Sequence, residues 1–164
     1  MRFIKSLIQS FYYAFRGLIK VISEERSFRI QLVAIFYVTL FALLYGLDKT
    51  QWAILWVTFC LIPALEIINT AIENTVDIKV REQNPNAKNA KDLAASAVLF
   101  SSIITIIVAI CLFSDKEKLL NAIQVAFTLP WLIIIIVTVF PAFIFIRGGK
   151  KDKHNRVENK KGTK

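Results

Sequence analysis

Long stretches without charged residues constrain this chain more than any other feature of its sequence. The stretch 93–113 holds 21 consecutive uncharged residues, and 30–47, 52–65 and 122–146 are also free of charge. About 18 or more apolar residues in a row are long enough to cross the hydrocarbon core of a bilayer as a helix. Hydrophobic residues make up 55% of the chain, which is more than an ordinary soluble domain of this size carries. The sequence therefore predicts an all-α membrane protein.

The polar residues between these stretches set the expected boundaries. Residues 1–24 are amphipathic at helical period, which is typical of a helix that lies in the bilayer interface with its cations toward lipid headgroups. Packing of this helix against other protein is an alternative that the pattern leaves open. The segment 23–29 is a charged patch, typical of a solvated junction. The remaining expected parts are spans at about 30–47, 52–76 and 93–113, a loop with a fourth span over 114–146, and a basic, disordered tail over 147–164.

Lysine and arginine are distributed unevenly between the two sides of the predicted membrane. Residues 1–29, 78–91 and 147–164 hold six, four and eight of them, whereas the other polar turns hold only three. Loops rich in these residues stay in the cytoplasm. We therefore expect a multi-pass protein with four crossings whose N- and C-termini are cytoplasmic.

The second span ends in an acidic segment, LEIINTAIENTVD, at residues 65–77. At about 100° per residue, Glu66, Asn69, Thr70, Glu73 and Asp77 share one face of the helix. A charged side chain at membrane depth costs about 2.5 kcal/mol or more unless it faces protein, water or a cation. The segment therefore predicts a functional site at the cytoplasmic edge of the membrane.

Three further charged residues are expected at the same edge: Glu25, Lys91 and Asp92. Carboxylate oxygens suit Mg²⁺, and a lysine among them suits a phosphate, so these are the ingredients of phosphoryl transfer. The five glycines are too scattered for a phosphate-binding loop. His154 is the sole histidine, which argues against a zinc site.

Two motifs carry a resemblance to a known family. They are E-x-x-N-T-A-I-E-x-x-V-D at residues 66–77 and A-K-D-x-A-A-x-A-V-L at residues 90–99. With them, the chain resembles the prokaryotic diacylglycerol kinase and undecaprenol kinase family of small integral-membrane lipid kinases. Gly17 and the pattern Glu25-x-x-Phe28-Arg29 support the resemblance, which covers about residues 10–113.

The resemblance implies a lipid-kinase core over residues 1–113 with three family-type spans, so the fourth span is extra. It also implies Mg²⁺ and ATP as cofactor and substrate, a membrane lipid as the phosphate acceptor, and the bacterial inner (plasma) membrane as the location. Family members form homotrimers with active sites shared between neighbouring subunits, and no nucleic-acid partner is expected.

The resemblance also assigns roles to individual residues. Glu66 matches a general base that takes the proton of the lipid hydroxyl, Asn69 lies near that base, and Asp77 is a further acid of the motif. The residues matched to Mg²⁺ are Glu25 and Glu73. The residues matched to ATP are Tyr13 (the weakest match), Glu25, Glu73, Lys91 (near the transferred phosphate) and Asp92.

Several alternatives stay open on the sequence alone. Glu66 could instead pair with Lys91 to hold helices together, although one lysine cannot neutralise four nearby acids. A small transporter or cation channel with acids along a pore is a second function, and a non-enzymatic scaffold is a third. For the lipid, Lys88 and Ala94–Ala95 resemble the Gram-positive-type branch of the family, and this resemblance implies undecaprenol rather than diacylglycerol. Ser96 and Asn89 depart from the usual family residues.

The fourth span has no charged residue within the membrane. We therefore expect that truncation after Ser114 leaves an active enzyme.

Overall fold

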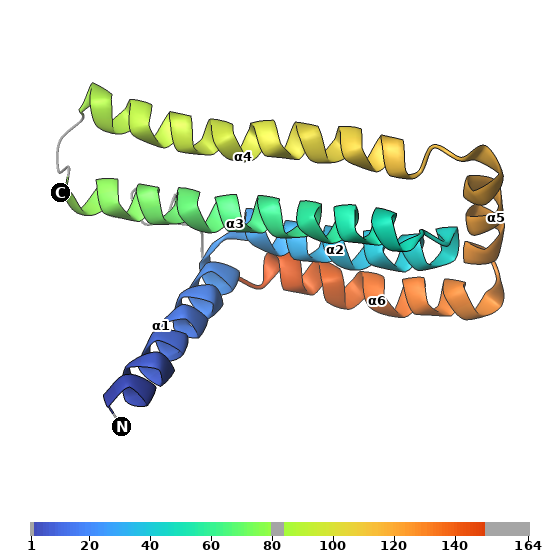
Figure 1. Ribbon diagram of the computed structural model, residues 1–164, viewed down its shortest axis with the longest axis horizontal. Helices are drawn as coiled ribbons and strands as arrows, with labels where there is room; N and C mark the ends of the chain where they lie inside the picture. The colour runs from blue at the N-terminus through green and yellow to red at the C-terminus, as the bar shows by residue number, and fades with distance from the viewer. Residues whose placement is uncertain (1, 80–83, 150–164) are drawn as a thin grey trace.

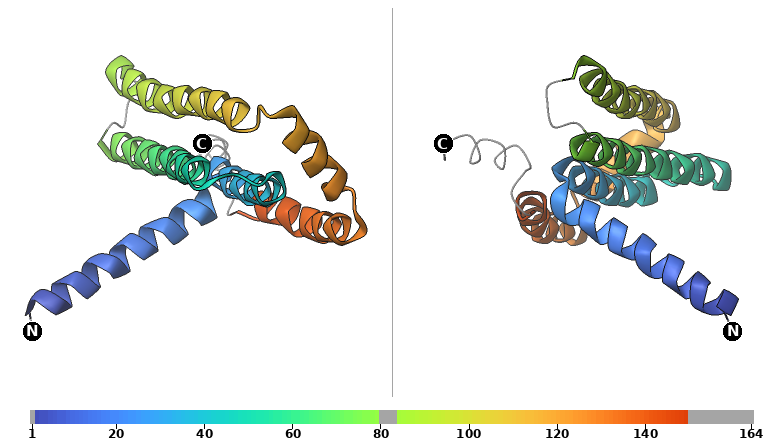
Figure 2. Two further views of the ribbon diagram at one scale, coloured as in Figure 1. Left: turned by 45° about the vertical axis from the view of Figure 1, so that its right-hand side comes forward. Right: turned by 90° about the vertical axis from the view of Figure 1, so that its left-hand side faces the viewer.

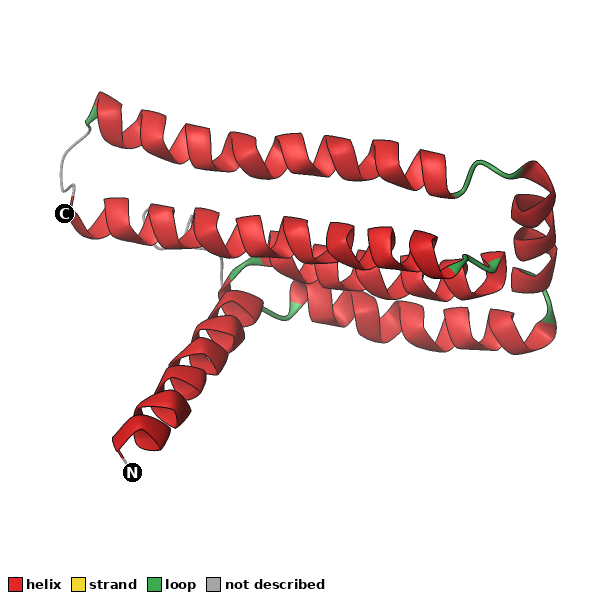
Figure 3. Cartoon of the chain, in the orientation of Figure 1, coloured by secondary structure: helices red, strands yellow, loops and turns green. Residues whose placement is uncertain are grey.

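The computed structural model describes residues 2–79 and 84–149, and within them the chain is helical with no strand (Figure 3). The helices are α1 (Arg2–Glu24), α2 (Arg26–Tyr45), α3 (Lys49–Lys79), α4 (Pro85–Leu112), α5 (Lys116–Ala126) and α6 (Leu129–Arg147). Four of these helices, α2, α3, α4 and α6, are long and apolar enough to cross a membrane. The predicted class, an all-α membrane protein, is confirmed. The predicted disorder of the tail from residue 150 lies outside the described residues.

The four long helices, α2, α3, α4 and α6, run side by side as a bundle (Figure 1). The two other helices, α5 and α1, lie at opposite ends of this bundle. α2 lies against both α3 and α6, and α3 forms the most extensive helix pair with α4. α5 lies across one end of the bundle, between the end of α4 and the start of α6 (Figure 2). α1 projects away from the other end, and its side chains from residue 4 to residue 20 are exposed. Such exposure suits the interfacial role predicted for α1, which stays a prediction.

Short polar residues and a glycine set several helix ends. The Asn84 side chain accepts a hydrogen bond from the Asn86 N–H at 2.9 Å, and Pro85 follows it where a missing N–H costs nothing. α2 stops at Gly46, whose φ of 72° is left-handed and whose N–H donates to Ala42 O at 3.1 Å. A glycine adopts this conformation without the steric cost that other residues meet there.

The sequence predicted a loop and a fourth span over 114–146, and the structure divides the uncharged stretch 122–146 between two helices. α5 ends at Ala126, and the fourth span begins at Leu129. The Asp115 side chain starts α5 by accepting hydrogen bonds from the N–H groups of Glu117 and Lys118, at 3.0 and 3.2 Å. Pro130 lies in the first turn of α6, where proline is tolerated. An absence of charge does not reveal such a break, because both helices are apolar on the sides that pack.

The other three spans are longer than predicted and bring polar residues onto helices. α3 is one continuous helix through Pro63, so Glu66, Glu73 and Asp77 share its last four turns. α4 starts at Pro85 rather than near residue 93, and it therefore carries Lys91 on its second turn. The junction 23–29 also differs from expectation, because Arg29 is only 4% exposed rather than solvated.

The hydrophobic core lies at the end of the bundle that α5 covers, which we call the packed end. The Tyr45 ring packs edge-on against the Phe113 ring, with 5.0 Å between centroids, and Phe41 packs against both. The Tyr45 hydroxyl oxygen accepts a hydrogen bond from the Asp115 N–H at 2.9 Å. The buried residues of this core come from α2, α3, α4 and α5 and from the turn after α2, so the packed end fixes the relative positions of these four helices. Its buried residues are Ala42, Tyr45, Leu47, Leu55, Leu112 and Ala122.

Candidate functional site

A cavity of about 420 Å³ opens between α2, α3 and α4 at the opposite end of the bundle. We call this the acidic end; its carboxylates are Glu25, Glu66, Glu73 and Asp77. Glu66 lines the cavity and is only 6% exposed, so the acid predicted as the base is withdrawn from bulk water but faces open space. The other lining residues are Ser27, Ile30, Gln31, Asn69, Ala95, Val98, Leu99 and Ser102.

Gln31 is the partner of Glu66 in this cavity. Its Nε2 donates a hydrogen bond to Glu66 Oε2 at 3.4 Å, which fixes one oxygen of the carboxylate. The Gln31 Oε1 atom is buried and has no hydrogen-bond partner among the described residues. Sequence reasoning missed Gln31, although an amide near the start of the uncharged stretch 30–47 was a signal that could have found it.

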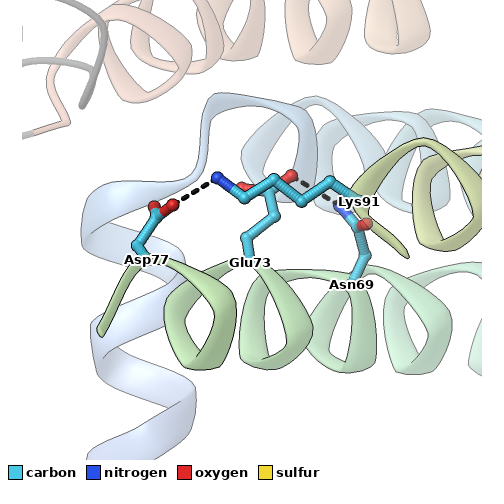
Figure 4. Close-up of polar contacts among 4 residues, drawn as sticks. All are labelled: Asn69, Glu73, Asp77 and Lys91. Atoms are coloured by element: carbon cyan, nitrogen blue, oxygen red, sulfur yellow. Dashed lines mark hydrogen bonds and ion pairs between the residues drawn. The ribbon is translucent and has the colours of Figure 1, made fainter. Parts of the chain in front are cut away.

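The acidic face of α3 continues outward from Glu66 as the periodicity predicted. Asn69 Nδ2 donates a hydrogen bond to Glu73 Oε1 at 3.2 Å, one helical turn apart. On the next turn, Asp77 forms an ion pair with Lys91, which reaches over from α4 past Glu73 (Figure 4). Lys91 is therefore engaged with Asp77 rather than with Glu66, and a purely structural Glu66–Lys91 pair is not what the structure shows.

Glu25 approaches the same place from a different part of the chain. It is the single residue between α1 and α2, with extended backbone angles of φ −102° and ψ 114°. Glu25 and Glu73 lie near enough for their negative charges to act on the Glu66 carboxylate. The fold thus places the residues that the resemblance matched to Mg²⁺ within electrostatic range of the residue matched to the base.

The donor chemistry of Glu25 and Glu73 fits Mg²⁺. No three side chains of the types Asp, Glu, His and Cys form a metal-binding group among the described residues. Mg²⁺ does not need such a cage, because it commonly uses one or two carboxylates together with phosphate oxygens and waters. Two carboxylates beside a cavity are therefore compatible with a metal that arrives with a nucleotide.

Two residues matched to ATP are not gathered at this site. Tyr13 is 56% exposed on α1, where its hydroxyl oxygen accepts a hydrogen bond from Gln9 Nε2 at 3.1 Å. Asp92 is exposed and, one residue beyond Lys91 on α4, points about 100° away from it. The ATP-binding roles of Tyr13 and Asp92 stay predictions.

Comparison with known proteins identifies the family. Residues 12–113 match the family described as prokaryotic diacylglycerol kinase, which is more than half of the chain. The chain belongs to the prokaryotic diacylglycerol kinase family. The matched region of this diacylglycerol kinase family member contains the cavity and all the acids of the acidic end, whereas α5 and α6 lie beyond it.

Relatives within this family carry two names. The chain is 40% identical over 108 residues to a diacylglycerol kinase of Synechocystis sp., a match that covers 65% of this chain and 62% of that protein. It is 35% identical over 108 residues to the undecaprenol kinase of Bacillus subtilis, with 66% and 88% covered. It is 30% identical over 101 residues to the diacylglycerol kinase of Escherichia coli K12, with 62% and 83% covered. The predicted membership of a lipid-kinase family is confirmed.

Proposed function

We propose that this protein is an ATP-dependent kinase that phosphorylates the hydroxyl group of a membrane lipid, either undecaprenol or diacylglycerol. The observation that carries the proposal is the buried Glu66 carboxylate, which faces a cavity at the end of an apolar helix. A lipid hydroxyl must reach its base from within the membrane, and a nucleotide must reach the same point from water. A site at the end of a span meets both requirements.

Glu66 is the proposed general base. A base must lie within hydrogen-bond reach of the proton that it accepts, and only the cavity side of Glu66 is open to a substrate hydroxyl. Gln31 helps to orient the carboxylate by donating to Oε2, and Ser27, which also lines the cavity, interacts with the same carboxylate. The proton moves from the lipid hydroxyl to Glu66 as the hydroxyl oxygen attacks the terminal phosphorus of ATP and ADP leaves.

Glu25 and Glu73 are the proposed ligands of the Mg²⁺ that accompanies ATP. Mg²⁺ held by these two carboxylates would supply positive charge that offsets the negative charge developing on the transferred phosphate. The Asn69 amide holds one Glu73 oxygen and so fixes the direction of the carboxylate. Lys91 lies one turn outward, at Asp77, where its ammonium group would contact the phosphates.

The proposed topology places the acidic end in the cytoplasm of a bacterium and the packed end on the outer face of its plasma membrane. The excess of lysine and arginine on the N-terminal, 78–91 and C-terminal segments supports this orientation. We further propose a homotrimer with sites shared between subunits, a state that family resemblance alone supports.

A transporter or cation channel is less well supported by the arrangement of the acids. A pore requires polar residues along its whole length, whereas the membrane-depth acids of the described spans gather at one end of α3. A smaller pocket of about 120 Å³ shares Gln31 with the cavity, and the surface that lines it is almost entirely apolar. Such a surface suits a lipid chain better than an ion.

The experiment that tests the kinase proposal is lipid-stimulated ATP consumption by the purified protein in detergent. Undecaprenol and diacylglycerol, supplied separately and then together at equal mole fraction, identify the acceptor. We expect turnover with Mg²⁺ and a preference for undecaprenol, for which Lys88 and Ala94–Ala95 are the support. No turnover with any prenol or glyceride would overturn the proposal, and ion flux in its place would favour the channel.

A further inference from the structure

Arg29 connects the last turns of two helices that are far apart in sequence. Its Nη1 donates hydrogen bonds to Ile22 O and Ser23 O of α1, at 2.9 and 3.3 Å. Its Nε and Nη2 both donate to Ile146 O, in the last turn of α6, at 3.2 Å. A single buried guanidinium thus ties the end of α1 to the end of the fourth span.

Both helix ends need such a donor. The last four carbonyl groups of a helix have no partner within the helix, and they carry the negative end of its dipole. A cation placed there satisfies the carbonyls and is favoured by the dipole. Arginine, with five N–H groups in a planar fork, can serve two helix ends at once, whereas lysine offers only a point charge.

The chain just after α6 is shaped to admit this guanidinium. A Cβ atom added at Gly149 would lie 2.1 Å from Arg29 Nη1 and 2.2 Å from Nη2. A larger residue at position 149 therefore requires the guanidinium or the backbone after α6 to shift, and either shift separates Arg29 from its present neighbours. Glycine is required here by close approach to Arg29, not by its backbone angles.

The junction that Arg29 holds is the one that carries Glu25. Glu25 is the only residue between α1 and α2, and its N–H donates to Val21 O at 2.8 Å. Arg29 follows it by one turn of α2, and its own N–H points to Glu25 O at 3.4 Å. Movement of the Arg29 side chain would therefore release the last turn of α1 and, with it, the backbone that sets the place of Glu25.

We propose that Arg29 and Gly149 are positioning residues, and that the fourth span holds Glu25 in place for the metal–nucleotide site. This inference rests on the function proposed above, because it concerns the role given to Glu25. On this proposal α6, which lies outside the family match, supports the reaction by positioning Glu25 and does not contact the substrate. It also reverses the sequence-based expectation for truncation after Ser114, since removal of α6 takes away the acceptor at Ile146.

The test uses a double-mutant cycle between positions 29 and 149 in the full-length chain. Gly149→Val should raise the KM for Mg-ATP by about tenfold, the change that corresponds to loss of one hydrogen bond to a charged group. In an Arg29→Met background the same substitution should change KM less than about twofold, because the guanidinium that it displaces is already gone. Equal effects in both backgrounds would overturn the proposal.

A matched control removes another bond between α6 and α2. The Tyr37 hydroxyl donates to Thr138 Oγ1 at 3.2 Å, away from the junction, and Thr138→Val removes that acceptor. We expect the KM for Mg-ATP to stay within about twofold in this variant, with kcat unchanged. If Thr138→Val has the same effect on KM as Gly149→Val, the fourth span merely stabilises the fold and the proposal is wrong. Gly149→Ala adds the same Cβ with less bulk and replaces the valine variant if that variant does not fold.

A second measurement does not depend on activity. Spin labels at Ser10→Cys on α1 and Thr50→Cys on α3, in a Cys60→Ala/Cys111→Ala background, report the direction of α1 through the distance between them. We expect one narrow distance distribution in the parent and in Thr138→Val, and a broad one in Gly149→Val and in the chain truncated after Ser114. A narrow distribution in all of them would overturn the proposal even if every protein is active. A narrow distribution in the parent together with a broad one in Gly149→Val and in the truncated chain would uphold the proposal even if the parent phosphorylates no lipid. The two proposals can therefore fail separately.

Discussion

The two ends of the helix bundle use the same helices for opposite purposes. At the packed end, Tyr45 is 4% exposed, contacts two other aromatic rings and has its hydroxyl bound to the Asp115 N–H. At the acidic end, the same α2 and α3 stand beside α4 around a cavity of about 420 Å³. The packed end holds the spans in place, which allows the acidic end to keep space for ligands.

Polar atoms at the two ends differ in the same way. Buried polar groups in proteins nearly always have hydrogen-bond partners, and an exception calls for an explanation. The buried Gln31 Oε1 and Asn69 Oδ1 at the cavity have none among the described residues. Both line the cavity beside Glu66, so the unpaired atoms lie where a substrate hydroxyl or a water molecule would bind. These unpaired atoms therefore support the proposal that ligands bind at the acidic end.

The largest expected effect comes from Glu66→Gln, which keeps the shape of the side chain but cannot accept a proton at neutral pH. We expect kcat to fall by about 10²–10⁴-fold, the usual contribution of a general base, with little change in either KM. Steady-state lipid kinase assays check this. Glu117→Gln, the same change on α5 at the packed end, is the control and should leave kcat unchanged. A loss below about tenfold would reject the role of base but not the kinase, because phosphoryl transfer can depend mainly on positioning.

Glu73→Gln should have the next largest effect, on binding rather than on kcat. Removal of one carboxylate oxygen from a Mg²⁺ shell should weaken Mg-ATP binding by at least about tenfold, the loss typical when support for a metal site is removed. Titration of Mg²⁺ and ATP against the purified variant measures this. Partial recovery at high Mg²⁺ is expected, and an unchanged affinity for both would show that Glu73 is not a metal ligand.

A smaller effect is expected from Gln31→Leu, which keeps the side-chain volume but removes the donor to Glu66. The loss of about 1 kcal/mol that follows removal of one hydrogen bond corresponds to a roughly fivefold lower kcat. Gln31→Glu, which cannot donate when ionised, should lower kcat further. An unchanged kcat in both variants would mean that the 3.4 Å contact with Glu66 has no part in catalysis.

The smallest expected effect is at the packed end. Tyr45→Phe keeps the ring contacts but leaves the Asp115 N–H without its partner, which should cost about 1 kcal/mol of unfolding free energy. Thermal unfolding in detergent should show a lower midpoint, and kcat and both KM values should stay as they are. A lower kcat or a changed KM in Tyr45→Phe would contradict the view that the packed end stabilises the fold while the acidic end binds substrates.

The sequence predicted what depends on local pattern and missed what depends on distant contacts. Helical period placed Glu66, Asn69, Glu73 and Asp77 on one face, and the structure keeps them in one row. The break between α5 and α6 was missed because it lies at Phe127 and Thr128, just before Pro130, and no change of hydropathy marks it.

Arg29 shows the limit of such reasoning. Within the charged patch 23–29 it reads as a solvated side chain, and its burial follows from a carbonyl group 117 residues later in the chain. No periodicity links these positions. The two glycines after α6, Gly148 and Gly149, were the only nearby sequence feature that bears on this contact. Their role becomes clear only in the structure, where the guanidinium of Arg29 lies against Gly149.

The path of the chain also has a consequence for biogenesis. Of the four described spans, α2 leaves the ribosome before the others and α6 after them, yet α6 lies against α2 rather than against α4. Until α6 is inserted, the Tyr37 hydroxyl lacks Thr138 and the Arg29 guanidinium lacks Ile146 O. The junction is therefore completed only after α6 has been made, so on the proposal above a chain that stops before α6 should carry its kinase motifs without the contacts that hold Glu25 in place.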